Sequence, residues 1–91
     1  MKTIQVAEFV AEEVKKHIKH PYSVFQKAPE TYKVVFRDET KEELCSFLVQ
    51  RTSEFAGVVG KDFQGPVEIS AIVSYLSELS GLFSLGAAGK N

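Results

Sequence analysis

The chain has 91 residues, a net charge of -1, and 44% hydrophobic and 25% charged residues. A chain of this length fits one domain, because domains usually span about 50 to 250 residues. The composition excludes an intrinsically disordered or collagen-like protein. We therefore expect one domain over residues 1–91, in which 86–91 form a C-terminal tail.

The first segment predicts an amphipathic helix from about Val6 to Lys19. Its apolar residues recur at spacings of three and four, as on one face of a helix. Pro21 ends this helix, because it disfavours the helical conformation at the residue before it and has no backbone N–H. Acidic residues interrupt the segment, so it does not resemble a secretory signal. The single cysteine, Cys45, allows no intramolecular disulfide, and we expect a cytoplasmic protein.

Two runs over 22–27 and 31–37 are rich in β-branched and aromatic residues and predict a β-hairpin. In the second run, apolar residues alternate with a partly basic set that includes Lys33 and Arg37. This alternation is typical of a half-buried strand. A lone hairpin is marginally stable, so we expect its apolar face to pack against helices.

The sequence Thr40-Lys41-Glu42-Glu43 has the pattern of a capping box, in which the first and last side chains satisfy each other's backbone N–H groups. It predicts a helix from Thr40 to about Phe55 or Val59. Gly57 and Gly60 would weaken and close it.

A third helix is predicted from Pro66 to about Ser80, with Gly81 as its stop. If it persists further, residues spaced three, four, three and four apart form a continuous apolar seam: Ile69, Ile72, Leu76, Leu79 and Phe83. The order helix, β-hairpin, helix, helix predicts a small α+β domain. Its helices would pack on one face of a short antiparallel sheet.

Five serines of this last segment lie outside the seam, and Glu78 is its only charged residue after Glu68. Small hydroxyl side chains let another backbone approach closely and leave few charges to desolvate. Our first hypothesis is therefore a non-enzymatic interaction module, such as a small regulator, inhibitor or assembly subunit. Its partner would be another protein chain, either a second copy or a different protein. The predicted interface comprises Ile69, Ile72, Tyr75, Leu76, Leu79, Leu82, Phe83 and Leu85. A central helix covered by its own domain explains the same pattern.

Charge is unevenly distributed along the chain. Residues 14–37 hold six lysines and arginines against one acid, Glu30, whereas residues 38–54 hold five acids against two bases. The alternative hypothesis is a nucleic-acid-binding regulator, with Tyr22 or Phe25 available for base stacking. The bases assigned to it, which could equally contact an acidic protein, are Lys15, Lys16, Lys19, Lys33 and Arg37.

No motif predicts catalysis, a metal or a cofactor, and we expect none of the three. Cys45 fits a small core hydrophobe better than a nucleophile. His17 and His20 near Glu13 are too few for a typical zinc site and fit solvated residues at a helix end. The apolar segment 69–88 contains Glu78 and five serines, so we expect no membrane span.

Overall fold

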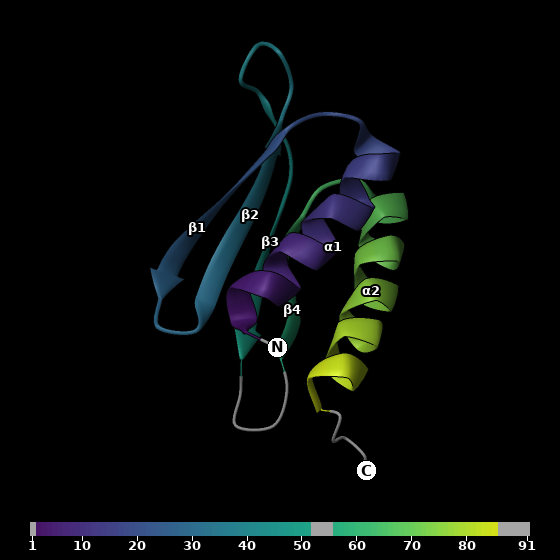
Figure 1. Cartoon of the computed structure of the whole chain (residues 1–91). Helices are drawn as coiled ribbons and strands as arrows, with labels where there is room; N and C mark the ends of the chain where they lie inside the picture. The colour runs from purple at the N-terminus through teal and green to yellow at the C-terminus, as the bar shows by residue number, and fades with distance from the viewer. Residues whose placement is uncertain (1, 52–55, 86–91) are drawn as a thin grey trace.

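The computed structural model describes residues 2–51 and 56–85, except for the side chains of residues 60, 61, 77 and 79–85. The elements in chain order are α1 (Thr3–Ile18), β1 (Tyr22–Ala28), β2 (Thr31–Arg37), β3 (Glu43–Arg51), β4 (Ala56–Gln64) and α2 (Val67–Leu85). The strands form one antiparallel sheet in the order β1-β2-β3-β4, and both helices lie on the same face of it (Figure 1). The protein is a small, compact α+β domain.

Helix α1 confirms the first predicted helix, although it begins at Thr3 rather than near Val6. At its start the backbone N–H of Lys2 donates to Gln5 Oε1 over 2.7 Å. At its end Lys19 adopts the left-handed conformation, with φ of 63°, and donates its N–H to the carbonyl of Lys15. The apolar stripe of α1, from Val6 to Val14, is fully buried against the sheet and α2.

The predicted β-hairpin is confirmed by β1 and β2, which pair Tyr22 with Phe36 and Val24 with Val34. Both pairs face the helices, because their side chains contact the hydrophobic core. Glu30 in the connecting turn has a left-handed φ of 59°. The turn predicted at residues 28–30 therefore lies where the sequence placed it.

The predicted middle helix is wrong, because residues 43–51 and 56–64 form β3 and β4 instead. The residues of the capping-box pattern form a turn rather than the start of a helix. Asp38 Oδ1 accepts hydrogen bonds from the backbone N–H and hydroxyl of Thr40, and from the backbone N–H of Glu42. This is a side-chain-stabilised turn of the type that aspartate favours, and Lys41 completes it with φ of 70°. The chain thus reverses direction where a helix was expected to start.

The apolar residues that follow fit two periods at once. Leu44, Phe47 and Leu48 have helical spacing, whereas Cys45, Phe47 and Val49 have the period of two that suits a strand. The sheet register places the second set in the core, where each of these residues is at most 1% exposed. The local sequence fits the helical and the strand pattern equally well. Pairing with β2 selects the strand pattern.

Helix α2 confirms the last predicted helix and extends it beyond Ser80 to Leu85. It starts directly after Pro66, whose carbonyl accepts the backbone N–H groups of Ile69 and Ser70. It packs against β4 and α1, and its Val73 and Leu76 are buried in the core. The predicted tail, residues 86–91, lies outside the described residues.

Candidate interaction surfaces

The solvent-facing side of α2 carries apolar side chains at a spacing of four. Val67 is 77% exposed and Tyr75 is 64% exposed, and the exposed Ala71 lies between them. Residues at i, i+4 and i+8 lie on one face of a helix. We call these three residues the α2 stripe. Val67 and Ala71 were not among the predicted interface residues, although Val67, Ala71 and Tyr75 follow one another at a spacing of four.

Beside the α2 stripe, the two helices enclose a groove of about 400 Å³. Its lining residues, which define the α1–α2 groove, are Glu13, His17, Ala71, Ile72, Tyr75 and Leu76. The α2 side of the groove is therefore apolar or aromatic, whereas the α1 side is polar. The carboxylate of Glu13 also pairs with Lys16, with Nζ and Oε2 3.0 Å apart.

The residues of the predicted α2 interface divide into three groups. Leu76 is only 6% exposed, and Ile69 and Ile72 pack against the core while remaining partly accessible. Tyr75 is exposed. The side chains of Leu79, Leu82, Phe83 and Leu85 lie outside the described residues. The described residues of the seam thus pack α2 against the rest of the domain. The α2 stripe lies on another side of the same helix and is exposed to solvent.

The second candidate surface is the face of the sheet opposite the helices, which no helix of the described chain covers, although Val35 and Ser46 on its central strands are only 2% and 1% exposed (Figure 1). Strand alternation and register assign its residues, because the core-facing positions alternate with these. We call this surface the open face. It comprises Ser23, Phe25 and Lys27 of β1, Lys33, Val35 and Arg37 of β2, Ser46 and Leu48 of β3, and Val59 of β4.

An aromatic ring surrounded by positive charge lies at one end of the open face. Phe25 is 44% exposed and pairs directly with Lys33 across β1 and β2. The Lys27 Nζ lies 5.9 Å from the centroid of the Phe25 ring, within the range of a cation–π contact. Phe25 was one of the two stacking candidates predicted from the sequence.

The other end of the open face contains a hollow of about 320 Å³. Ser23, Val35 and Arg37 contribute to it from the open face. The remaining lining residues are Pro21, Tyr22, Asp38, Glu39 and Lys41. The guanidinium Nη1 of Arg37 donates to the carbonyl of Lys41 over 3.3 Å, which positions this cation at the rim.

The two acids at this hollow have partners of their own. The hydrogen bonds from Thr40 and from the backbone of Glu42 hold the pKa of Asp38 below its ordinary value. Glu39 lies near His20, with Oε2 and Nδ1 3.9 Å apart. A third acid, Glu43, pairs with Arg37 in the strand register at the end of β3.

The sheet separates the bases that the sequence grouped together. Lys33 and Arg37 lie on the open face, whereas Lys15 and Lys16 are exposed on α1, on the other side of the sheet. Lys19 follows the end of α1. Sequence position alone could not reveal this division, because it depends on which face of the hairpin the helix covers.

Cys45 lies in the core, as the sequence predicted. Cys45 is 1% exposed, and its burial, with a contribution from Glu43, raises its pKa to about 11. Its thiol is therefore protonated at neutral pH and inaccessible. Among the described residues no three His, Cys, Asp or Glu side chains lie close enough together to hold a metal ion. In the same part of the chain, neither helix is long and apolar enough to cross a membrane.

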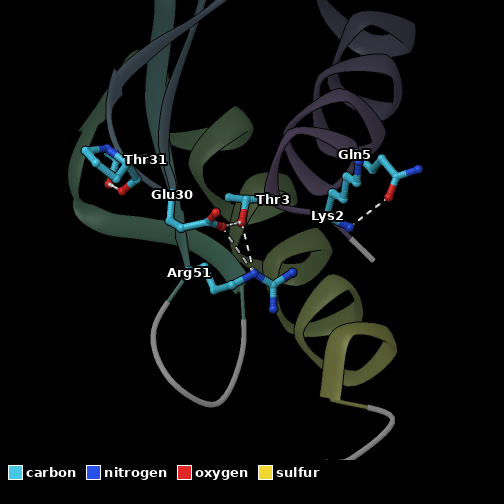
Figure 2. A network of polar contacts seen from close by, with 7 residues as sticks. Lys2, Thr3, Gln5, Glu30, Thr31 and Arg51 are labelled. Carbon is cyan, nitrogen blue, oxygen red and sulfur yellow. Dashed lines mark hydrogen bonds and ion pairs between the residues drawn. The ribbon is translucent and has the colours of Figure 1, made fainter.

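A polar network joins three elements near the start of α1 (Figure 2). The hydroxyl of Thr3 donates to Glu30 Oε1, and Arg51 Nε donates to Thr3 Oγ1 over 2.9 Å. Arg51 Nε also lies 3.5 Å from Glu30 Oε1, and its backbone N–H donates to the Glu30 carbonyl. Because these groups satisfy one another, the network ties α1 to the β1–β2 turn and to the end of β3.

Comparison with protein-family models, with curated proteins and with solved structures finds no match to this chain. Its function has to be inferred from the α2 stripe, the α1–α2 groove and the open face.

Proposed function

We propose that this chain is a non-enzymatic protein-interaction module that acts in the cytoplasm by docking a partner chain on the exposed side of α2. The observation that carries this proposal is the α2 stripe, where Val67 and Tyr75 are 77% and 64% exposed. Exposed apolar side chains next to a groove are typical of surfaces that another protein covers.

The composition of α2 supports docking. Glu68 and Glu78 are its only charged residues, so a partner desolvates few charges as it approaches. The exposed Ser74, beside Tyr75, is small enough to allow close backbone approach. Tyr75 combines a large apolar ring with a hydroxyl that can bond to a partner, a property that makes tyrosine frequent at the centre of interfaces.

The α1–α2 groove indicates the kind of partner. It lies between two helices, with Ile72 and Leu76 on its α2 side and Glu13 and His17 on its α1 side. An amphipathic helix fits such a groove by inserting apolar residues at helical spacing. A basic residue beside those apolar anchors would meet the carboxylate of Glu13. The proposed partner segment is therefore an amphipathic helix with a basic flank, from a second copy or from another protein.

Three immobilised baits test this proposal: the wild-type chain, Tyr75→Glu and Phe25→Glu. The two substitutions place the same charge at exposed aromatic positions, one on α2 and one on the opposite side of the molecule. Loss of a central tyrosine typically costs at least about 2 kcal/mol of binding, so we expect Tyr75→Glu to lose its partner by roughly 30-fold or more. Phe25→Glu should retain it.

Bound proteins are compared by quantitative mass spectrometry, and self-association is followed by sedimentation velocity of the same three proteins. Circular dichroism and thermal unfolding confirm that each variant is folded. A partner, or a dimer, that survives Tyr75→Glu unchanged would contradict the proposal, as would the absence of any partner or self-association with the wild-type chain.

A further inference from the structure

We propose that the open face is a binding site for single-stranded nucleic acid, separate from the α2 surface. The site combines Phe25, as a platform for a base, with Lys27, Lys33 and Arg37, as contacts for phosphates. It does not depend on the proposed protein partner, since the two surfaces lie on opposite sides of the sheet.

The first support is the setting of Phe25. Its ring is 44% exposed at the edge of the sheet, with Lys33 directly across the strand pair and the Lys27 Nζ 5.9 Å from its centroid. A base that stacks on this ring brings its own phosphate within reach of both ammonium groups. Stacking on an aromatic side chain beside positive charge is the usual way in which flat sheet surfaces hold single strands.

The second support is the line of charge along β2. Lys33 and Arg37 are four residues apart on the same side of one strand, which separates their Cα atoms by about 13 Å. Val35 between them is 2% exposed and offers almost no accessible surface, so the two cations are the groups of this row that a ligand can reach. A flexible single strand can follow such a row, with a phosphate at each cation.

The third support is the hollow of about 320 Å³ at the Arg37 end, because it leaves room for a phosphate beside that guanidinium. Its two cations, Arg37 and Lys41, are matched in number by its two acids, Asp38 and Glu39. Asp38 Oδ1 already accepts three hydrogen bonds within its turn, and Glu39 lies near His20. Arginine has five N–H donors, and the bond to the Lys41 carbonyl uses one of them.

Charge complementarity also decides against two other occupants. A second copy would bring Lys27, Lys33 and Arg37 against their own counterparts, and like charges across an interface are unfavourable. A rigid duplex keeps its bases stacked on one another, so none is available for Phe25. In the strand register Arg37 pairs with the acid Glu43, whereas Lys33 pairs with Phe25 and Leu48, so the positive charge faces no acid at the Phe25 end of the open face.

The test measures fluorescence anisotropy of labelled oligouridine and oligothymidine of about 12 nucleotides, titrated with the full chain. We expect the wild-type chain to bind in the micromolar range at low salt, with affinity falling steeply between about 50 and 200 mM salt. Phe25→Leu keeps apolar bulk but removes the ring, and should weaken binding roughly 5- to 100-fold. Lys33→Gln and Arg37→Gln should each reduce the salt slope by about 1.

Lys15→Gln and Lys16→Gln are the matched controls, because they remove equal charge from the other side of the sheet. They should leave affinity within about twofold of wild type. Thermal unfolding of every variant checks that the fold is intact. Four results would overturn the proposal: no binding at low salt, an equal loss in the α1 controls, equal affinity for a duplex of the same length, or displacement by polyglutamate as effective as by unlabelled oligonucleotide.

Discussion

The two faces of the sheet are made by the same strands yet differ in the charge that they carry. On the covered face Val34, Phe36 and Phe47 are completely buried under the helices. On the open face, Lys33 and Arg37 alternate with those residues along β2 and carry charge. Because side chains of a strand point alternately to the two faces, a segment of seven residues can serve the core and a binding surface at once. We therefore expect folding and the proposed binding to be separable by substitution in this protein.

The largest expected contrast compares one phenylalanine from each face. Phe36→Ala should lower the free energy of unfolding by about 3 to 5 kcal/mol, because it leaves a cavity in a closed core. Phe25→Ala, at a ring that is 44% exposed, should cost less than about 1 kcal/mol. Urea denaturation followed by circular dichroism measures both values.

If Phe36→Ala leaves no folded protein, Phe36→Leu replaces it, with an expected cost of about 1.5 kcal/mol or less. Similar losses at positions 25 and 36 would show that the open face is as important for folding as the covered face. The comparison between the two faces would then fail.

A smaller effect is expected at the polar network beside α1. Thr3→Val keeps the shape of a side chain that is 3% exposed but removes the hydroxyl shared by Glu30 and Arg51. The side chains of Arg51 and Glu30 are 28% and 59% exposed, so water can replace part of the lost bonding, and the loss should cost about 0.5 to 1.5 kcal/mol. Thr3→Ser retains the hydroxyl and should recover most of the loss in the same denaturation experiment. Equal losses in both variants would assign the effect to the missing methyl group instead.

The smallest effect is a pH dependence on the covered face. Burial, together with the hydrogen bond from its hydroxyl to Glu12 Oε2, raises the pKa of Tyr22 to about 12. The Tyr22 hydroxyl holds its proton more tightly in the folded state than in the unfolded state, in which its pKa is about 10. Its contribution to stability is therefore complete below pH 10 and is lost as the pH rises from about 10 towards 12.

Ultraviolet titration of tyrosinate follows this ionisation, and thermal unfolding over the same range follows the stability. Tyr22→Phe should remove both the late absorbance change and this part of the pH dependence. If the wild-type chain and Tyr22→Phe lose stability in parallel above pH 10, the shift at Tyr22 does not contribute to it.

The sequence predicted the elements whose signals are local. The apolar stripe of α1, its end before Pro21, and the alternation of β2 each lie within a few residues of one another, and all three predictions are confirmed. The α+β class followed from them. Each of these segments has a single hydrophobic period, so its sequence favours only one secondary structure.

Residues 43–64 could not be assigned in this way, because Phe47 belongs to a helical and a strand pattern alike. The strand structure depends on pairing with β2, in which Val34 lies opposite Phe47 and Phe36 lies opposite Cys45. The candidate surfaces could not be predicted from the sequence for a related reason. Whether Lys33 and Lys15 share a patch, or whether Tyr75 faces solvent, is set by the side on which the helices pack.

The central claim is that the exposed side of α2 is the protein-docking surface, whereas the open face is not. Photo-crosslinking tests it most directly, with benzoylphenylalanine placed at position 75 or at position 25 of the full chain. Both positions are exposed aromatic residues, so the probe fits each without repacking the core. The account predicts that the probe at position 75 forms an adduct with one protein, and that the probe at position 25 does not capture it. No protein adduct from position 75, or the same protein captured from both positions, would contradict the claim.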